Sequence, residues 1–255
     1  MADGPKGPWS EDERHDLPPL EEVSEEGGRE PFFNMPGGVL VALALLFLIF
    51  AIQDWIVSPA LSEWIVLEFG FSPIRYAYPL AQQDLAWIWT PLTYSLLHGG
   101  VQHLLFNGLW LAVFGTPVFR RIGAIRFCLL WLVTAVGGAA LHMLLNWGDA
   151  TLLVGSSAVI AGMMGCACRF AFGAGRHAFR FADDVRFLRR FGILEALKIR
   201  MVVTFILVFG VSNLIFAVGP PIFGDPGGPI AWDAHLGGFL VGFLGFAAFD
   251  RDAPR

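Results

Sequence analysis

The 255-residue sequence is poor in charge and in cysteine. Charged residues make up 15% of the chain, against about 25% in typical soluble domains. The three cysteines fall inside or near the ends of apolar segments, which argues against a disulfide scaffold. No stretch interleaves basic and aromatic residues on a polar face, so we expect no nucleic-acid partner.

The charge that is present is unevenly placed. Residues 1–30 hold ten acidic and three basic residues, a net charge of −7, whereas the remaining chain holds twelve acids and fourteen bases, a net charge of +2. The tail has almost no aliphatic residues, so we expect residues 1–34 to form a disordered acidic cytoplasmic tail. A solvated leader without a specific role is favoured over a regulatory or partner-binding segment.

Long uncharged runs predict membrane-spanning helices, because a span needs about 20 predominantly apolar residues. The segment 85–102, which Pro91 interrupts, is interpreted as a loop leading into the second span. We predict an all-α, polytopic membrane protein, a bundle of six transmembrane helices. The six predicted spans are residues 37–57, 103–119, 126–147, 157–175, 200–218 and 233–250.

The basic residues predict the orientation of these spans. With a cytoplasmic N-terminus, sixteen of the seventeen Lys and Arg residues fall on the cytoplasmic side, and Arg75 alone does not. This is the asymmetry that the positive-inside rule describes. We therefore expect both termini in the cytoplasm and the protein in the plasma or inner membrane of a bacterium. Residues 35–250 form the predicted membrane domain, and residues 251–255 its cytoplasmic end.

The first outer loop, residues 58–102, is long and rich in aromatic side chains. Its aromatic residues include Trp64, Phe69, Phe71, Tyr76, Tyr78, Trp87 and Trp89. Amphipathic rings prefer the membrane interface, so we expect short helices that lie in that interface. An ordinary packed loop is the alternative.

Polar residues at the starts of the even-numbered spans are candidates for a functional site, because polar groups in lipid are costly. His103 and Asn107 share one face of the second span through their i, i+4 spacing. Ser157 begins the fourth span, and His235 lies near the start of the sixth. All even-numbered spans start from the same side of the membrane. The sequence therefore gathers these four residues at a shallow depth on the outer side.

This set of residues predicts acyl transfer. Ser157 is the candidate nucleophile, and His235 is the base that takes its proton. His103, Asn107 and the backbone N–H groups at the start of the fourth span can stabilise an oxyanion. Asp233 is close to His235 in sequence, but residues i and i+2 of a helix point apart, so we do not expect it to complete a triad. No metal or cofactor is expected.

Other polar residues favour structural roles. His98 lies in the loop before the second span and can hold that loop by a hydrogen bond. His142 and Asn146 repeat the i, i+4 spacing and are expected to be interhelical hydrogen-bond partners. Cys166 and Cys168 point apart on a helix and lack the spacing of a metal site.

Three motifs start the even-numbered spans: His103-x-x-x-Asn107, Gly155-Ser156-Ser157-Ala158 and Ala234-His235-x-x-Gly238-x-x-x-Gly242. In this order the chain resembles the rhomboid intramembrane serine proteases, and the resemblance covers residues 37–250. Two positions depart from the family pattern. Ala158 stands where glycine is common, and Ala161 stands where some members have an aromatic residue.

The resemblance implies a rhomboid-like bundle and a dyad of Ser157 and His235 without an acid. It also implies oxyanion stabilisation by groups such as His103 and Asn107, and cleavage of membrane-spanning protein substrates near their outer end. The protein would then be a serine-type endopeptidase that works in the lipid bilayer.

Small residues on the sixth span have a packing role of their own. Gly238, Gly242 and Gly245 share one face of that helix, and small faces let helix backbones approach closely in lipid. Such an approach would bring His235 to Ser157.

Two alternative functions stay open. An inactive rhomboid-like protein that binds membrane clients is disfavoured because such relatives typically lack the serine or the histidine. A small transporter or channel is disfavoured because a transport path should distribute polar groups across the whole depth of the membrane.

Overall fold

The computed structural model describes residues 35–172, 184–218 and 231–251, and the predicted tail lies outside them. Within these ranges the fold is all-helical, and the pairing of Phe71 with Leu153 is an isolated bridge rather than a strand. Three helical segments of the described chain are long and apolar enough to cross a membrane: Gly37–Ile56, Val101–Leu145 and Trp232–Phe249. The chain is an integral membrane protein.

The predicted second and third spans form one helical segment that glycine breaks. The segment consists of α5 (Val101–Trp110), the π-helical turn η4 (Leu111–Gly115) and α6 (Thr116–Leu145). Inside α6, Gly123 has φ 76° and ψ 173°, a conformation that glycine adopts because it has no Cβ. Two separate helices therefore meet at Gly123, close to the boundary that the sequence predicts.

The central helix α7 (Ser157–Ala167) is shorter than its predicted range of 157–175. At about 1.5 Å per residue it is roughly 16 Å long, and most of its residues are buried. The helix ends before Arg169, whose buried guanidinium donates to the Phe191 and Phe243 carbonyls at 2.9 and 2.6 Å. The sequence prediction was too long because apolar residues follow Arg169 past the point where the chain turns, and its last three residues, 173–175, lie outside the described ones.

Close backbone contact joins α7 to α10 (Trp232–Phe249), its most extensive partner. A Cβ atom at Gly238 would overlap the Ala158 carbonyl, and one at Gly242 would overlap the Gly162 carbonyl. A Cβ at Gly245 would meet no atom of the described residues within 4 Å. The expected role of Gly245 in this contact is therefore wrong, because the contact repeats every four residues, from Gly238 to Gly242, and Gly245 comes only three residues later.

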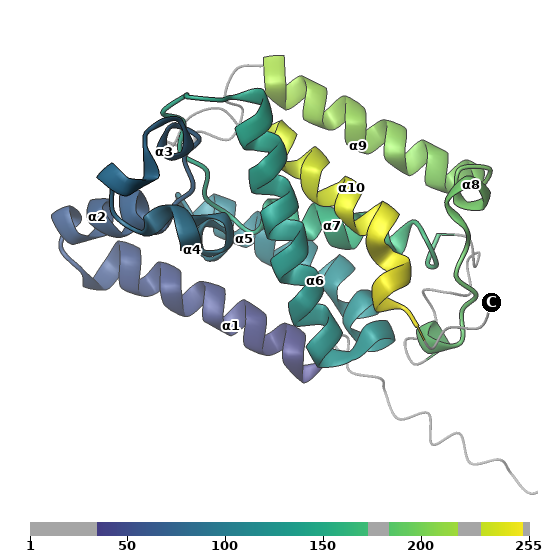
Figure 1. The fold of residues 1–255 in the computed structure, drawn as a ribbon. Helices are drawn as coiled ribbons and strands as arrows, with labels where there is room; N and C mark the ends of the chain where they lie inside the picture. The colour runs from purple at the N-terminus through teal and green to yellow at the C-terminus, as the bar shows by residue number, and fades with distance from the viewer. Residues whose placement is uncertain (1–34, 173–183, 219–230, 252–255) are drawn as a thin grey trace, which may run out of the picture. The chain divides into compact units, whose positions relative to one another are not determined.

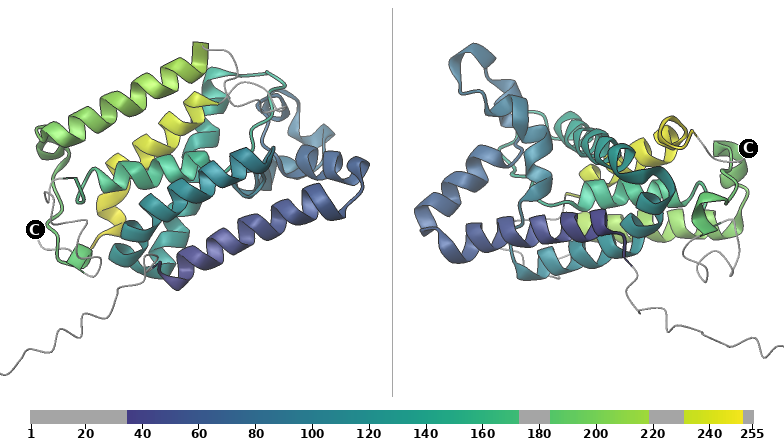
Figure 2. Two further views of the ribbon diagram at one scale, coloured as in Figure 1. Left: turned by 180° about the vertical axis from the view of Figure 1, so that it is seen from behind. Right: turned by 90° about the horizontal axis from the view of Figure 1, so that it is seen from below.

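Two further helices flank this centre. Figures 1 and 2 show α9 (Arg200–Val218) beside α10, and α1 (Gly37–Ala51) on the opposite side of the bundle. The π-helical turn η1 (Ile52–Ile56) extends α1, and the short helices η5 (Asp184–Arg186) and α8 (Ile193–Ala196) precede α9.

Aromatic rings hold α9 against its neighbours. Phe209 stacks on Phe239 of α10 with 4.9 Å between ring centroids. Phe205 contacts Phe114 and Phe172 at centroid distances of 5.8 and 4.7 Å. These contacts set how α9 is rotated toward α10.

The first loop folds into short helices at one end of α1 (Figure 2). Their bounds are α2 (Pro59–Phe69), α3 (Ile74–Ala77), η2 (Leu80–Gln82), α4 (Ala86–Thr93) and η3 (Tyr94–Leu96).

The loop interpretation of residues 85–102 is wrong for α4, which includes Pro91. Proline has no N–H for the Trp87 carbonyl one turn earlier. The Tyr76 hydroxyl donates to that carbonyl at 2.7 Å instead. Burial raises the pKa of Tyr76, so the hydroxyl keeps the proton that it donates.

A buried ion pair ties the far end of α10 to α6. Arg121 donates from Nε and Nη2 to the two carboxylate oxygens of Asp250 at 3.0 and 2.9 Å, and from Nη1 to the Val185 carbonyl at 2.8 Å. The two charged side chains are 1% and 4% exposed. A bidentate pair of this kind is a strong, geometrically specific contact, so it holds α10 at the end opposite to His235.

Candidate active site

Ser157 and His235 meet where α7 and α10 begin. The distance between Ser157 Oγ and His235 Nε2 is 2.8 Å, and both residues are partly exposed. The neighbouring Ser156 is fully buried, and its Oγ lies 3.5 Å from Nε2 of His98. The two adjacent serines therefore face different histidines, and of the two it is Ser157 that lies within hydrogen-bond reach of His235.

His103 and Asn107 of α5 lie against the backbone that leads into α7. Gly155 has φ 113°, and a Cβ there would lie 2.6 Å from His103 Nε2 and 3.5 Å from Asn107 Nδ2. Glycine is therefore required at this position both for its backbone conformation and for space. The glycine leaves room for both side chains two residues before Ser157.

Asn107 carries a buried amide nitrogen that the described residues leave without a hydrogen-bond partner. The side chain is 5% exposed, and its Nδ2 has no hydrogen-bond partner among the described residues. A buried donor without a partner typically costs about 1–3 kcal/mol. Such a donor is suited to an acceptor that arrives with a substrate.

Backbone donors lie beside the same place. The first N–H groups of a helix have no intrahelical acceptor, and the Ser156 side chain does not cap α7. The partial positive charge of these N–H groups at the start of α7 favours a negative charge near Ser157.

The first loop supports the segment that enters α7. The backbone N–H of Gly155 donates to the Tyr94 carbonyl at 2.9 Å, and the Tyr94 hydroxyl donates to the Ala135 carbonyl at 2.9 Å. Phe71 and Leu153 exchange backbone hydrogen bonds of 3.0 and 2.8 Å. These contacts position the residues before Ser157 through buried bonds to two other parts of the fold.

Asp233 turns away from His235, as the sequence predicts. Its Oδ1 lies 2.8 Å from His142 Nδ1, and the Asn146 amide donates to its Oδ2. On the other side of the ring, the Thr151 hydroxyl lies 3.3 Å from His142 Nε2. The expectation that His142 and Asn146 are interhelical hydrogen-bond partners is confirmed, and α10 is the helix that they bind.

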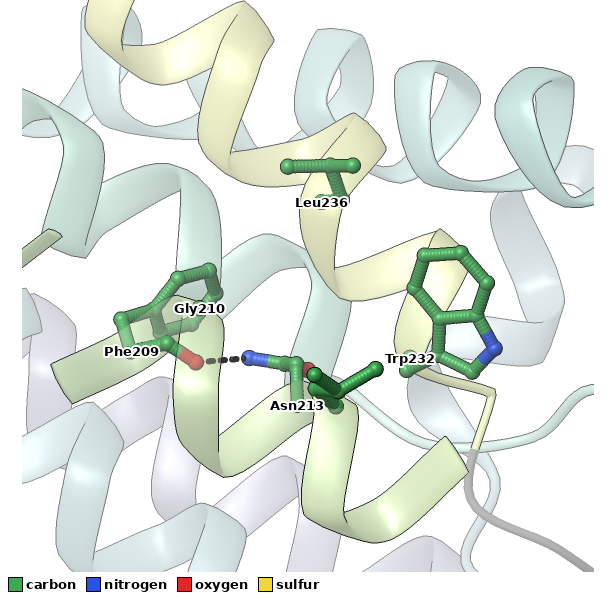
Figure 3. A pocket seen from close by; sticks show the side chains of 6 residues that line it. Phe209, Gly210, Asn213, Trp232 and Leu236 are labelled. Carbon is green, nitrogen blue, oxygen red and sulfur yellow. Dashed lines mark hydrogen bonds between the residues drawn. The ribbon is translucent and has the colours of Figure 1, made fainter. Parts of the chain in front are cut away.

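Asn213 of α9 contacts His235 and was missed by the sequence analysis. The distance from Asn213 Oδ1 to His235 Nδ1 is 2.8 Å, and Asn213 Nδ2 donates to the Phe209 carbonyl at 2.8 Å (Figure 3). Asn213 is 7% exposed. The signal was available, because Asn213 is a polar residue inside an apolar helix, the property that singled out His103 and Asn107.

An apolar groove lies between α9 and α10 next to this contact. Its volume is about 220 Å³, and its lining residues are Phe209, Gly210, Asn213, Leu214, Trp232 and Leu236 (Figure 3). Asn213 thus lines the groove and also contacts His235.

The described residues form no group of three or more His, Cys, Asp or Glu side chains that could hold a metal ion. The three cysteines Cys128, Cys166 and Cys168 are free. The groups that the described residues gather at the candidate site are a hydroxyl, an imidazole and an amide nitrogen.

The comparisons with known proteins agree on one family. The family model described as the Rhomboid domain matches residues 86–250. Rhomboid-related protein 2 of Mus musculus is 26% identical over 219 residues, which cover 84% of this chain and 65% of that protein. RHOMBOID-like protein 4 of Arabidopsis thaliana is 32% identical over 164 residues, 64% of this chain and 34% of that protein. Rhomboid protease GluP of Bacillus subtilis is 29% identical over 160 residues, 63% of this chain and 26% of that protein.

The matched regions cover at most 65% of the length of these three relatives. The relatives come from an animal, a plant and a bacterium, so they give the expected bacterial origin no support.

Proposed function

Because the chain belongs to the rhomboid family, we propose that it is an intramembrane serine endopeptidase that cleaves membrane-spanning proteins. The observation that carries the proposal is the 2.8 Å contact between Ser157 Oγ and His235 Nε2. A serine hydroxyl is a weak nucleophile, and a base within hydrogen-bond reach activates it.

In the proposed reaction, Ser157 Oγ attacks the carbonyl carbon of the scissile peptide while its proton passes to His235 Nε2. The resulting oxyanion accepts hydrogen bonds from Asn107 Nδ2, from His103 and from the first N–H groups of α7. His235 then returns the proton to the leaving amine, and the acyl group stays on Ser157. Water, deprotonated by the same imidazole, hydrolyses this ester and releases the second product.

We propose six membrane spans with both termini in the cytoplasm. The six helical segments 37–56, 101–122, 124–145, 157–167, 200–218 and 232–249 support this topology, as does the distribution of Lys and Arg residues. The short α7 fits the proposal because most of its residues are buried in the protein. Non-helical backbone at the end of a helix is tolerated at membrane depth where protein surrounds it. Residues 1–34 and 251–255 are then cytoplasmic.

The site lies in the first turns of α5, α7 and α10, so the proposal places cleavage near the outer end of the substrate. A peptide bond within an intact spanning helix is hydrogen-bonded and cannot present its carbonyl to Ser157. The substrate must therefore unwind locally, and glycine and proline weaken a helix by about 1 and 3 kcal/mol per residue relative to alanine. We expect the cut in the outer juxtamembrane third, beside a small residue, and slower cleavage when a nearby Gly or Pro becomes Leu.

The test compares the wild type with Ser157→Ala, and uses Ser156→Ala as the matched control. Each purified protein is treated with a fluorophosphonate probe and incubated with a single-span substrate, and mass spectrometry maps the cut. We expect labelling and cleavage to vanish in Ser157→Ala and to persist in Ser156→Ala. A cut at mid-membrane or on the cytoplasmic side would contradict the topology. A wild-type protein that neither labels nor cleaves would favour an inactive, client-binding member of the family.

A further inference from the structure

We infer that Asn213 is a positioning residue that selects the tautomer of His235 with the proton on Nδ1, and so keeps Nε2 free to accept the proton of Ser157. The inference rests on the proposed function, which assigns no role to α9. It goes beyond a dyad of serine and histidine, because it adds a neutral third member on a different helix.

The orientation of the Asn213 amide is decided by its second contact. Its nitrogen faces the Phe209 carbonyl at 2.8 Å (Figure 3), and a carbonyl can only accept a hydrogen bond. The amide oxygen must therefore be the atom 2.8 Å from His235 Nδ1. An amide oxygen can only accept, so the contact requires a proton on Nδ1.

The tautomer then decides what the other ring nitrogen can do. A neutral imidazole carries one proton, so a proton on Nδ1 leaves Nε2 as an acceptor. Nε2 faces Ser157 Oγ at 2.8 Å, in the geometry that a general base needs. The opposite tautomer would place an N–H against the hydroxyl and could not take its proton.

Among the described residues, the two positions nearest to His235 and Ser157 along the helices do not duplicate this contact. The Asp233 carboxylate, two residues before His235, binds His142 and Asn146. Ala161, one turn after Ser157 on α7, offers only a methyl group. Asn213 is therefore the group that α9 supplies to orient the ring.

Burial and packing keep the Asn213 amide in place. The residue is 7% exposed, which limits competition from water. One turn earlier on α9, Phe209 stacks on Phe239 of α10 and also provides the carbonyl that holds the Asn213 nitrogen. The packing of α9 against α10 thus fixes the position of Asn213 Oδ1, which accepts the hydrogen bond from His235 Nδ1.

The first test observes the tautomer directly. Nitrogen NMR spectra of the protein labelled with ¹⁵N-histidine distinguish a protonated from an unprotonated ring nitrogen, and a His235→Gln spectrum assigns the signals. We expect a protonated Nδ1 and an unprotonated Nε2 in the wild type, and a mixture of tautomers in Asn213→Leu. A wild-type spectrum with the proton on Nε2 would overturn the inference whether or not the variants fold.

The second test measures kinetics on a single-span substrate. Asn213→Leu keeps the approximate size of the side chain and removes the acceptor, so we expect kcat to fall about tenfold or more with KM unchanged. Asn213→Asp keeps an oxygen acceptor and should recover most of kcat. Ser212→Ala, one residue away on α9, is the matched control and should retain the wild-type kcat.

The outcomes separate the inference from the proposed function. A wild type that cleaves substrate, together with an Asn213→Leu variant of equal kcat, refutes the role of Asn213 alone. Equal losses in Asn213→Leu and Asn213→Asp would also refute it, because the acceptor would then not matter. A wild type without cleavage or probe labelling refutes the proposed function itself.

Discussion

Two histidines make hydrogen bonds at the first turn of α10: His142 binds Asp233 of that turn, and His235 belongs to it. Their hydrogen-bond partners differ in a way that bears on function. His142 of α6 has the Asp233 carboxylate at 2.8 Å on one nitrogen and the Thr151 hydroxyl at 3.3 Å on the other. His235 has the Asn213 amide at 2.8 Å and the Ser157 hydroxyl at 2.8 Å. Judged by residue type alone, the first set looks more like a hydrolase triad than the second.

The geometry of the two sets points the other way. His142 is 5% exposed, and its closest contact is a bond to a buried carboxylate, which holds α6 and α10 together. His235 is partly exposed and contacts Ser157, which follows by two residues the Gly155 that lies against the amide of Asn107. A histidine with a carboxylate can thus serve as a clamp, whereas a histidine with a neutral amide and a close hydroxyl has the arrangement of a base.

The comparison predicts its largest effect from removing each histidine in turn. His235→Ala removes the proposed base, and we expect kcat/KM to fall by about 10⁴-fold or more, because members of such a catalytic unit fail together. His142→Ala should retain activity per folded molecule within about twofold. Cleavage assays normalised to the folded fraction measure both. A greater loss of activity per folded molecule in His142→Ala than in His235→Ala would reverse the two assignments.

The next effect compares two asparagines. Asn107→Ala removes one proposed oxyanion donor, a change that typically lowers the rate by about 100- to 1000-fold. We expect Ser157 to retain part of its probe labelling in this variant. Asn146→Ala should lose stability and keep its activity per folded molecule. Unchanged turnover in Asn107→Ala would remove that residue from the site.

The contact between His142 and Asp233, which acts as the clamp between α6 and α10, should contribute to the stability of the fold. Removing His142 takes one hydrogen-bond partner from the buried Asp233 carboxylate, and a hydrogen bond to a charged group typically contributes about 1.5–3 kcal/mol. We expect His142→Ala to lower the free energy of unfolding by roughly this amount, as measured by denaturant unfolding in detergent. Arg75→Ala provides a more exposed comparison, because Arg75 is 18% exposed and its partner Asp84 is 57% exposed, and surface ion pairs contribute about 0–1 kcal/mol. Equal losses in the two variants would argue against a clamp.

The smallest predicted effect concerns the helix contact on which both histidine sets depend. Gly238→Ala puts a methyl group against the Ala158 carbonyl, and overpacking of this kind typically costs about 1–3 kcal/mol. Gly245→Ala is the matched control, because the described residues leave open space there, and it should be neutral or slightly stabilising. Thermal unfolding of the two variants measures the difference. A Gly238→Ala protein as stable as Gly245→Ala would show that α7 and α10 do not need this close contact.

Part of the site could be anticipated from residue spacing. His103 and Asn107 share a face because they are four residues apart, and the predicted alternation of spans places the starts of α5, α7 and α10 on one side. The structure places Ser157 and His235 within 2.8 Å. The same reasoning correctly turned Asp233 away from His235, since its carboxylate binds His142.

Other parts could not be anticipated because they depend on packing. Arg169 is followed by further apolar residues, so the end of α7 at Ala167 is not visible in hydropathy. The segment around Pro91 looked like a loop, yet the Tyr76 hydroxyl supplies the bond that proline cannot make. In both cases the backbone depends on tertiary contacts: Arg169 binds the Phe191 and Phe243 carbonyls, and Tyr76 binds the Trp87 carbonyl.

By itself the sequence determined an all-α membrane protein of the rhomboid family, since hydropathy and motif spacing are local properties of the chain. It also determined which residues stand at the starts of the helices. Only the tertiary structure decided that Asn213 meets His235. An apolar helix such as α9 has no polar face to set its rotation, and that rotation follows from the stacking of Phe209 on Phe239.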